Sequence, residues 1–173
     1  MFHHLSGNSK GISIIELLVG TGILTLSTSA LLGFLAFTIT TSSFLKQQTE
    51  ATALAQEALE AVRTFRDGTG WNDDDPQNEY DGLGQVQTDV AYRVALSGDV
   101  PPRWQLIAGS ETIGMFSRSV TFESVQRDVD DNIVESGGVQ DPNTKKVSVT
   151  VSWTAKTKQH DIALVSYFTN WKQ

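Results

Sequence analysis

The 173-residue sequence contains no cysteine, only three histidines and only four prolines. Without cysteine the chain can form neither a disulfide bond nor an iron–sulfur cluster, and thiol catalysis is excluded. Two of the histidines, His3 and His4, precede residue 11, which leaves His160 for the rest of the chain. No proline occurs in residues 12–66, so one uninterrupted helix is possible there.

Charge is also scarce in residues 11–45, where Glu16 is the only charged side chain. The other positions are apolar, small or hydroxylated, and they form no continuous polar stripe of the kind that an amphipathic helix carries. A run of more than about 18 such residues is typical of a membrane-spanning helix. The sequence therefore predicts one membrane-spanning helix near its N-terminus, closed by Lys46.

Glu16 is the unusual member of this run, because a charge inside hydrocarbon costs at least ~2.5–3.5 kcal/mol. No basic side chain follows it up to Leu45. The nearest positive charges are Lys10 and, if the chain is cut after Gly11, the new amino group of Ile12. A free amine on another copy of the chain could neutralise the carboxylate and set the register between packed helices.

This segment resembles the class III signal of type IV pilins and pseudopilins, because a short polar leader ends in Lys-Gly, an apolar residue follows, and a glutamate stands at the fifth position after the cut. The resemblance implies that a prepilin peptidase cleaves after Gly11 and methylates Ile12. It also implies that Glu16 helps lock each subunit into a filament. Leu17 and Leu18 would supply apolar contacts in such an assembly.

Two positions depart from the pattern of this family. Ile12 stands where phenylalanine is usual, and Gly33 stands where the family often has a proline that bends the helix. The motif and the apolar helix together cover about the first third of the chain. The resemblance implies a structural subunit of a type IV pilus or a type II secretion pseudopilus, of the minor rather than the major kind.

The partners that the resemblance implies are the prepilin peptidase, other pilin or pseudopilin subunits, the inner-membrane assembly platform and the lipid bilayer. The basic leader places the N-terminus in the cytoplasm by the positive-inside rule, with the rest of the chain on the outer side of the bacterial inner membrane and then in a filament. Two plainer interpretations stand beside this one. An ordinary secretory signal has a shorter apolar core without an acid, and a single-span anchor could carry an extracellular binding module that does not polymerise.

The sequence divides into four segments, which are a leader, a membrane-embedded assembly helix, an amphipathic helix and a globular head: residues 1–11, 12–45, 46–66 and 67–173. Apolar residues recur at helical spacing through the third segment, at Ala51, Ala55, Ala58, Val62 and Phe65. With no proline to interrupt it, one helix about 80 Å long is possible. Gly68 would end that helix with a left-handed cap.

The head reads as a series of strands, predicted at residues 91–96, 104–107, 118–126, 147–154 and 162–168. The clearest is 147–154, where Trp153 and three valines alternate with serine and threonine. The last two strands would form a hairpin about residues 155–158. The apolar face of the sheet needs a cover, which the amphipathic helix supplies. The predicted fold class is α+β, with Phe65, Trp153 and Phe168 in the core.

Two acidic segments contain side chains that could bind calcium. Residues 67–88 carry five candidate oxygen ligands, Asp73, Asp74, Asp75, Glu79 and Asp81, but the spacing of an EF-hand is absent. A solvated acidic loop and a calcium site both remain open there. Residues 128–132 read as the turn of a hairpin. The sequence assigns no metal site.

Acidic residues outweigh basic ones, with a formal net charge of −7, which argues against a nucleic-acid partner. The balance is uneven, because residues 67–141 hold fifteen acids against four arginines, whereas residues 142–173 hold five lysines against one acid. This asymmetry either guides docking between subunits or only solvates the surface. Four of the lysines form a candidate basic patch: Lys145, Lys146, Lys156 and Lys158.

No motif in the sequence predicts catalysis. The phosphate-binding loop and the nucleophile elbow are both absent. A Ser-His-Asp triad would need His160 to be well placed, and His160 lies beside a predicted hairpin turn. We therefore assign no catalytic residue and no cofactor, and we do not expect an enzyme.

Overall fold

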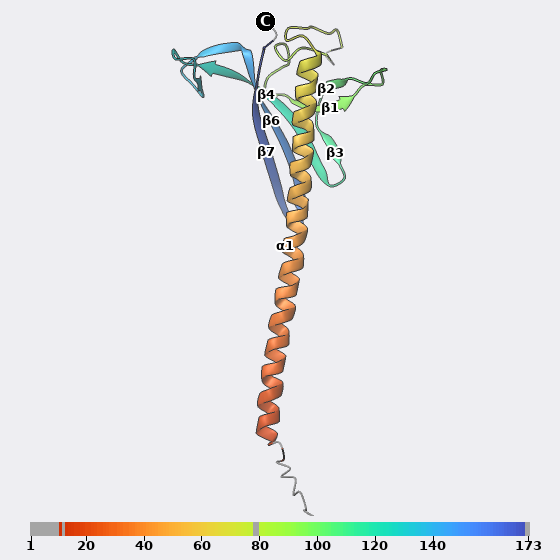
Figure 1. Ribbon diagram of the computed structural model, residues 1–173, viewed down its shortest axis with the longest axis vertical. Coiled ribbons are helices and arrows are strands. Elements are labelled where there is room, and N and C mark those ends of the chain that lie inside the picture. The colour runs from red at the N-terminus through yellow and green to blue at the C-terminus, as the bar shows by residue number, and fades with distance from the viewer. Residues whose placement is uncertain (1–10, 12, 78–79, 172–173) are drawn as a thin grey trace, which may run out of the picture. The chain divides into compact units, whose positions relative to one another are not determined.

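The computed structural model describes residues 11, 13–77 and 80–171 (Figure 1). The chain divides into two compact units, Met1–Leu45 and Lys46–Gln173. A single helix, α1 (Ile14–Gly68), has 55 residues and runs from the first unit into the second. The uninterrupted helix that the absence of proline permitted is confirmed, and it continues through Gly33.

The predicted end of the helix is wrong in one respect. Gly68 belongs to α1, two residues beyond the predicted boundary, and the glycines with a positive φ are Gly109, Gly114 and Gly137. The turn that follows α1 is held by a side chain, because the carboxylate of Asp73 accepts a 2.7 Å hydrogen bond from the Gly70 main-chain nitrogen. A left-handed glycine is therefore not needed to end the helix.

The second unit contains one antiparallel sheet of seven strands. The central order is β2-β1-β4-β6-β7, and the short strands β3 and β5 both pair with β4. The strands are β1 (Ala91–Leu96), β2 (Trp104–Ala108), β3 (Glu111–Ile113), β4 (Phe116–Arg127), β5 (Ile133–Val134), β6 (Val139–Ala155) and β7 (Lys158–Thr169). All five predicted strands are present, and β6 and β7 form the predicted hairpin. The α+β fold class is thereby confirmed.

Strand β6 begins much earlier than the sequence indicated. Its first part pairs with the end of β4 at Val125↔Asp141, and the next pair is Ser124↔Lys145. Three residues of β6, including Pro142, therefore have no partner on β4 and form a bulge. A bulge accommodates a proline that a regular ladder would exclude. Because proline is unfavourable in a regular strand, the sequence pattern did not predict this part of β6.

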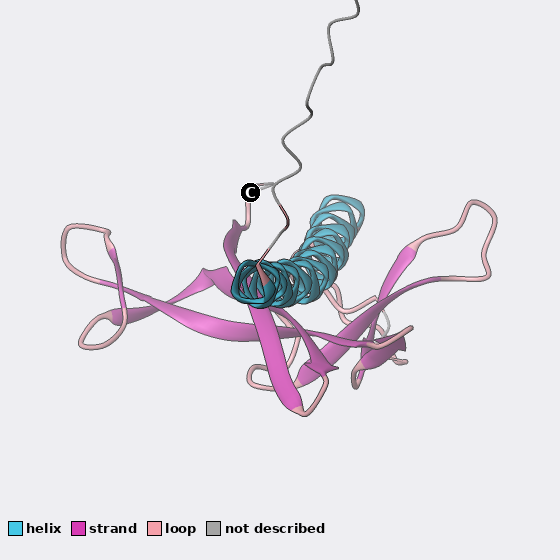
Figure 2. Cartoon of the chain, turned by 90° about the horizontal axis from the view of Figure 1, so that it is seen from below, coloured by secondary structure: helices cyan, strands magenta, loops and turns pink. Residues whose placement is uncertain are grey.

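The core of the second unit lies between one face of the sheet and the second half of α1 (Figure 2). The helix contributes Ala51, Ala55, Ala58, Ala61, Val62 and Phe65, all of them buried. Four of these six side chains are alanines, so most of the volume of this core comes from the side chains of the sheet. The sheet contributes larger side chains, among them Val120, Phe122, Val149, Val151, Trp153 and Phe168. The predicted stripe and the predicted core aromatics are confirmed.

The long loop between α1 and β1 also contributes to the core, which the sequence did not indicate. Trp71, Leu83 and Val86 are buried, and the Trp71 Nε1 donates a 3.1 Å hydrogen bond to the carbonyl oxygen of Pro142. The loop folds back on itself at Gly82, where an added Cβ would meet main-chain atoms of Gly70 and Trp71. The acidic loop is thus a packed element of the head.

Candidate functional site

The start of α1 holds the predicted processing and assembly residues. Gly11 is exposed, and Ile12 lies outside the described residues. The main-chain nitrogen of Leu17 donates a 3.1 Å hydrogen bond to the carbonyl oxygen of Ser13. Ser13 is therefore the N-cap of the helix, which begins at Ile14. Glu16 lies in the first turn, where a negative charge complements the helix dipole.

Ser13 and Glu16 have the spacing of a capping box, in which a serine precedes a glutamate by three residues at a helix start. This signal lies within the motif itself and was not among the predictions from the sequence. It supplies a local reason for a carboxylate at this position, besides the predicted pairing with an amine on another chain. The two roles differ in what they require, because a glutamine can serve in a capping box whereas only a carboxylate can form an ion pair.

Glu16, Leu17 and Leu18 are consecutive, so their side chains leave the helix about 100° apart. Leu17 is 61% exposed and Leu18 is 64% exposed. Among the residues that the structure describes, no ion pair involves Glu16. The structure thus places the three predicted assembly residues on the open surface of one helical turn.

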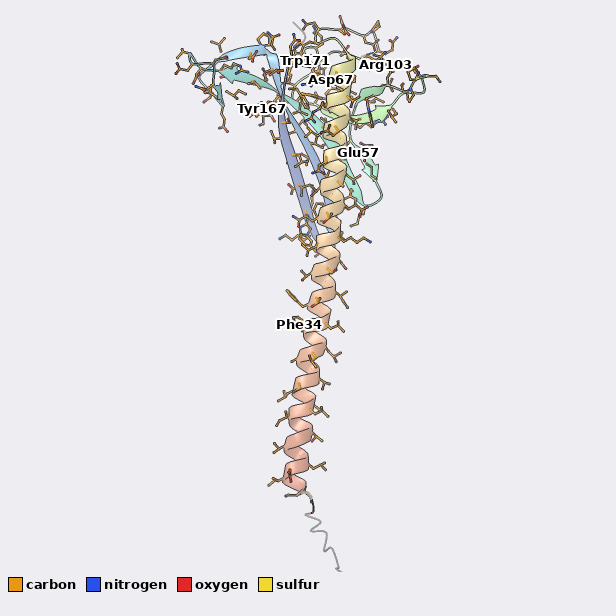
Figure 3. The ribbon with its side chains drawn as sticks, in the orientation of Figure 1. Phe34, Glu57, Asp67, Arg103, Tyr167 and Trp171 are labelled. Atoms are coloured by element: carbon orange, nitrogen blue, oxygen red, sulfur yellow. The ribbon has the colours of Figure 1, made fainter. Side chains whose placement is uncertain are left out.

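The apolar side chains of residues 14–40 are all exposed, and they project from every side of the helix, as around Phe34 in Figure 3. An 18-residue window of α1 has a mean hydropathy of 1.8, and none of it is buried within the chain. The chain therefore has one helix that is long and apolar enough to cross a membrane. Because exposure of so much apolar surface to water is unfavourable, lipid or other protein must cover it.

Several hydroxyl groups on this helix bond to its own backbone. The Oγ1 of Thr21 donates a 2.9 Å hydrogen bond to the carbonyl oxygen of Leu17, and the Oγ1 of Thr38 donates a 2.9 Å bond to that of Phe34. Thr40 and Ser43 make the same type of bond four residues back. Hydroxyls satisfied in this way need no water. They are therefore compatible with a helix in lipid or in a dry helix bundle.

The candidate basic patch is not a single surface. Lys145 is only 9% exposed, and burial lowers the pKa of its ammonium group. Lys146 lies on the other face of β6, where its Nζ is 3.0 Å from the Glu123 carboxylate, and that hydrogen bond raises the pKa of Lys146. Lys156 and Lys158 lie at the far end of the hairpin, about 30 Å along β6. Adjacent residues of a strand point to opposite faces of the sheet, so Lys145 and Lys146 do not share a surface although they are neighbours in sequence.

The remaining candidates for chemistry are placed as follows. Within the described ranges, which omit Glu79, no group of three His, Asp or Glu side chains is arranged to hold a metal ion. In the acidic loop, Asp81 instead accepts a 2.8 Å hydrogen bond from the main-chain nitrogen of Asp75. His160 is half-buried, and its ring stacks on Trp153 with 5.5 Å between ring centroids. His160 is thus a packed residue of the sheet's inner face.

Comparison with known proteins adds nothing to these observations, since no protein-family model, no curated protein and no solved structure matches this chain.

Proposed function

We propose that this chain is a structural subunit, of the minor kind, of a type IV pilus or a type II secretion pseudopilus. In this proposal a prepilin peptidase removes the leader after Gly11 and methylates Ile12. The subunit is stored in the inner membrane through α1 and then enters a filament through the same helix. The observation that carries the proposal is an apolar helix that no other described part of the chain covers, with a carboxylate in its first turn beside the predicted cleavage site.

The proposed role of Glu16 follows from its position. Cleavage would leave a positively charged amino group at Ile12, four residues before the carboxylate. In a bundle of such helices, the amine of one subunit can pair with Glu16 of its neighbour. A charge in an apolar surrounding is stabilised only where a partner of opposite charge meets it. Glu16 and the amine would therefore have to lie at the same level, which fixes the axial register of adjacent helices. Leu17 and Leu18 would supply apolar contacts on either side.

The second half of α1 supports the same proposal in a different way. It packs on the sheet through a stripe of alanines, so this part of the helix is anchored in the head. The exposed first half would be free to exchange lipid for other helices. The assembly platform and an ATPase outside this chain would supply the work of that transfer.

The test is the N-terminus of the chain isolated from membranes of its native cell. Mass spectrometry should find a mature protein that begins at Ile12 and carries one methyl group. A Gly11→Leu variant should remain at full length, whereas the nearby Gly20→Leu variant should be processed normally. A native chain that retains Met1, or that is cut near Ser43, would contradict the proposal and favour a simple anchor or a secretory signal.

A further inference from the structure

One end of the head carries a projection, which we call the β4–β6 arm and define as residues 125–141. There the ends of β4 and β6 extend past the covered part of the sheet and pair with each other, and the end of β4 also pairs with β5 (Figures 1 and 2). Arg127 joins its two sides, because its Nε lies 2.7 Å from the Asp141 carboxylate and its Nη1 donates a 2.8 Å hydrogen bond to the carbonyl oxygen of Asp131. The Asp128 carboxylate accepts two 2.9 Å main-chain hydrogen bonds within the turn. The arm therefore has a defined shape.

A groove of about 330 Å³ lies on the arm, and its lining is mainly apolar. Val129 and Val139 line it together with Pro142 and two glycines, and its polar lining comes from Arg127, Asp128, Gln140 and Asp141. Val129 is 100% exposed and Val139 is 79% exposed, so none of the residues that the structure describes covers them. Asp130 and Glu135 are exposed on the same arm. The arm thus presents apolar surface and carries a net negative charge, with five acids against one arginine in residues 125–141.

The opposite end of β6 has the opposite charge. The β6–β7 turn, residues 155–158, exposes Lys156, Thr157 and Lys158. No acid occurs in residues 155–160. Strand β6 has 17 residues and so extends for about 50 Å between this turn and the arm. The two surfaces of one subunit therefore cannot meet each other.

We propose that the groove on the β4–β6 arm of one subunit binds the β6–β7 turn of a second copy of this chain. The four-carbon stems of Lys156 and Lys158 would cover Val129 and Val139, while their ammonium groups reach the carboxylates of the arm. Lysine combines these two properties, because its stem is apolar and only its end is charged. Charge complementarity thus identifies the partner as another copy of the same head.

The contact joins two different surfaces, so it is heterologous and can repeat without closing. A contact of this kind builds an open helical array. The inference rests on the proposed function in this respect, because a filament would hold many heads side by side and let the contact repeat, although a single contact needs only two chains. It adds a contact between the globular heads to the contact between helices. It also explains why acidic and basic residues are separated along the chain.

The absence of native cysteine permits a direct test by cross-linking. Two full-length chains, one carrying Val129→Cys and the other Thr157→Cys, are expressed together and oxidised in intact cells or membranes. Both positions are exposed, so neither substitution disturbs the core. We expect a disulfide-linked dimer of the two chains. Its yield should fall as salt is raised, because exposed charges are screened beyond a Debye length of about 8–10 Å.

Val100 provides the matched control, because it is also a loop valine beside an aspartate and is 97% exposed. Chains with Val100→Cys and Thr157→Cys should give at least about tenfold less dimer, since no complementary surface brings these positions together. Equal yields from the two pairs would overturn the inference. So would the absence of the 129–157 dimer, whether or not the chain polymerises.

The state of the N-terminus separates this result from the proposed function. A chain that begins at Ile12 and sediments as polymer, yet gives no 129–157 dimer, refutes the docking and leaves the filament proposal standing. A chain that retains its leader but gives the dimer refutes the filament proposal and supports the docking. Charge exchange gives an independent measurement. Asp130→Lys with Glu135→Lys should reduce cross-linking about tenfold or more, and a partner with Lys156→Glu and Lys158→Glu should restore it.

Discussion

The Nη1 of Arg118 donates a 2.8 Å hydrogen bond to the main-chain carbonyl oxygen of Leu54, which joins β4 to α1 across 64 positions of sequence. The Arg118 side chain is only 4% exposed, and its Nε lies 2.7 Å from the Glu111 carboxylate on β3. One guanidinium therefore connects the helix, the central strand and the short strand beside it. This contact fixes where the helix lies on the sheet, in a core whose helix side consists largely of alanine.

Replacing Arg118 with methionine should destabilise the head. The substitution keeps an unbranched apolar stem but leaves Glu111 without its buried partner, and breaking a buried ion pair in this way costs about 2–4 kcal/mol. Urea unfolding of the full chain in detergent should show this loss. Arg63→Met is the matched control, because Arg63 pairs with Glu60 on the exposed face of α1. This substitution should change stability by less than about 0.5 kcal/mol. Equal losses in the two variants would show that Arg118 does not hold the helix to the sheet.

The alanine stripe predicts that a leucine substitution changes stability by very different amounts at two positions of α1. Ala55 is fully buried against the sheet, whereas Ala53 is exposed on the same helix. Leucine at position 55 would overfill the interface and should cost about 1–3 kcal/mol. Leucine at position 53 should change stability by less than about 0.5 kcal/mol. Thermal unfolding measured by circular dichroism distinguishes them, and a neutral Ala55→Leu would mean that helix and sheet are not closely packed.

Glutamine at position 16 separates the two proposed roles of Glu16. Glu16→Gln retains the side chain of a capping box but removes the charge, whereas Glu16→Ala removes both. If the carboxylate pairs with a neighbouring amine, both variants should be processed normally and both should fail to form polymer that sediments. Normal assembly of Glu16→Gln, with failure of Glu16→Ala, would restrict the residue to starting the helix.

The ion pair of Arg127 and Asp141 predicts a pH-dependent contribution to stability. Burial opposes the charge on Asp141, but hydrogen bonds from Arg127, Thr144 and Asn143 outweigh it and lower the pKa of the carboxyl. A lowered pKa stabilises the fold above the unfolded value of about 4, and the stabilisation is lost as pH falls through the folded pKa. Asp141→Asn should therefore cost about 1–2 kcal/mol at pH 7 and much less near pH 2.

A double-mutant cycle with Arg127→Met completes this test, because the coupling energy between the two substitutions should decrease over the same acidic range. Urea unfolding at several pH values gives both quantities. A loss in Asp141→Asn that is independent of pH would show that the ion pair does not stabilise the arm.

Local pattern predicted most of the secondary structure. The absence of proline predicted an unbroken helix. The alternation in residues 147–154 predicted the longest regular stretch of β6, and the helical spacing of Ala51 to Phe65 predicted the buried stripe. These predictions succeeded because period and steric restriction act between near neighbours in sequence. The same reasoning failed at Gly68, where the Asp73 side chain holds the turn, and at Pro142, where a bulge allows the strand to continue.

The sequence by itself determined that residues 11–45 are apolar with a single carboxylate, that one helix can carry them, and that the head is an antiparallel sheet covered by that helix. Only the tertiary structure decided that Lys145 is buried while Lys146 pairs with Glu123, that Arg118 reaches Leu54, and that the acidic arm and the basic turn occupy opposite ends of β6. The physical reason is that strand pairing and bulges between distant segments set the face and the end on which each side chain lies, and no local periodicity encodes them.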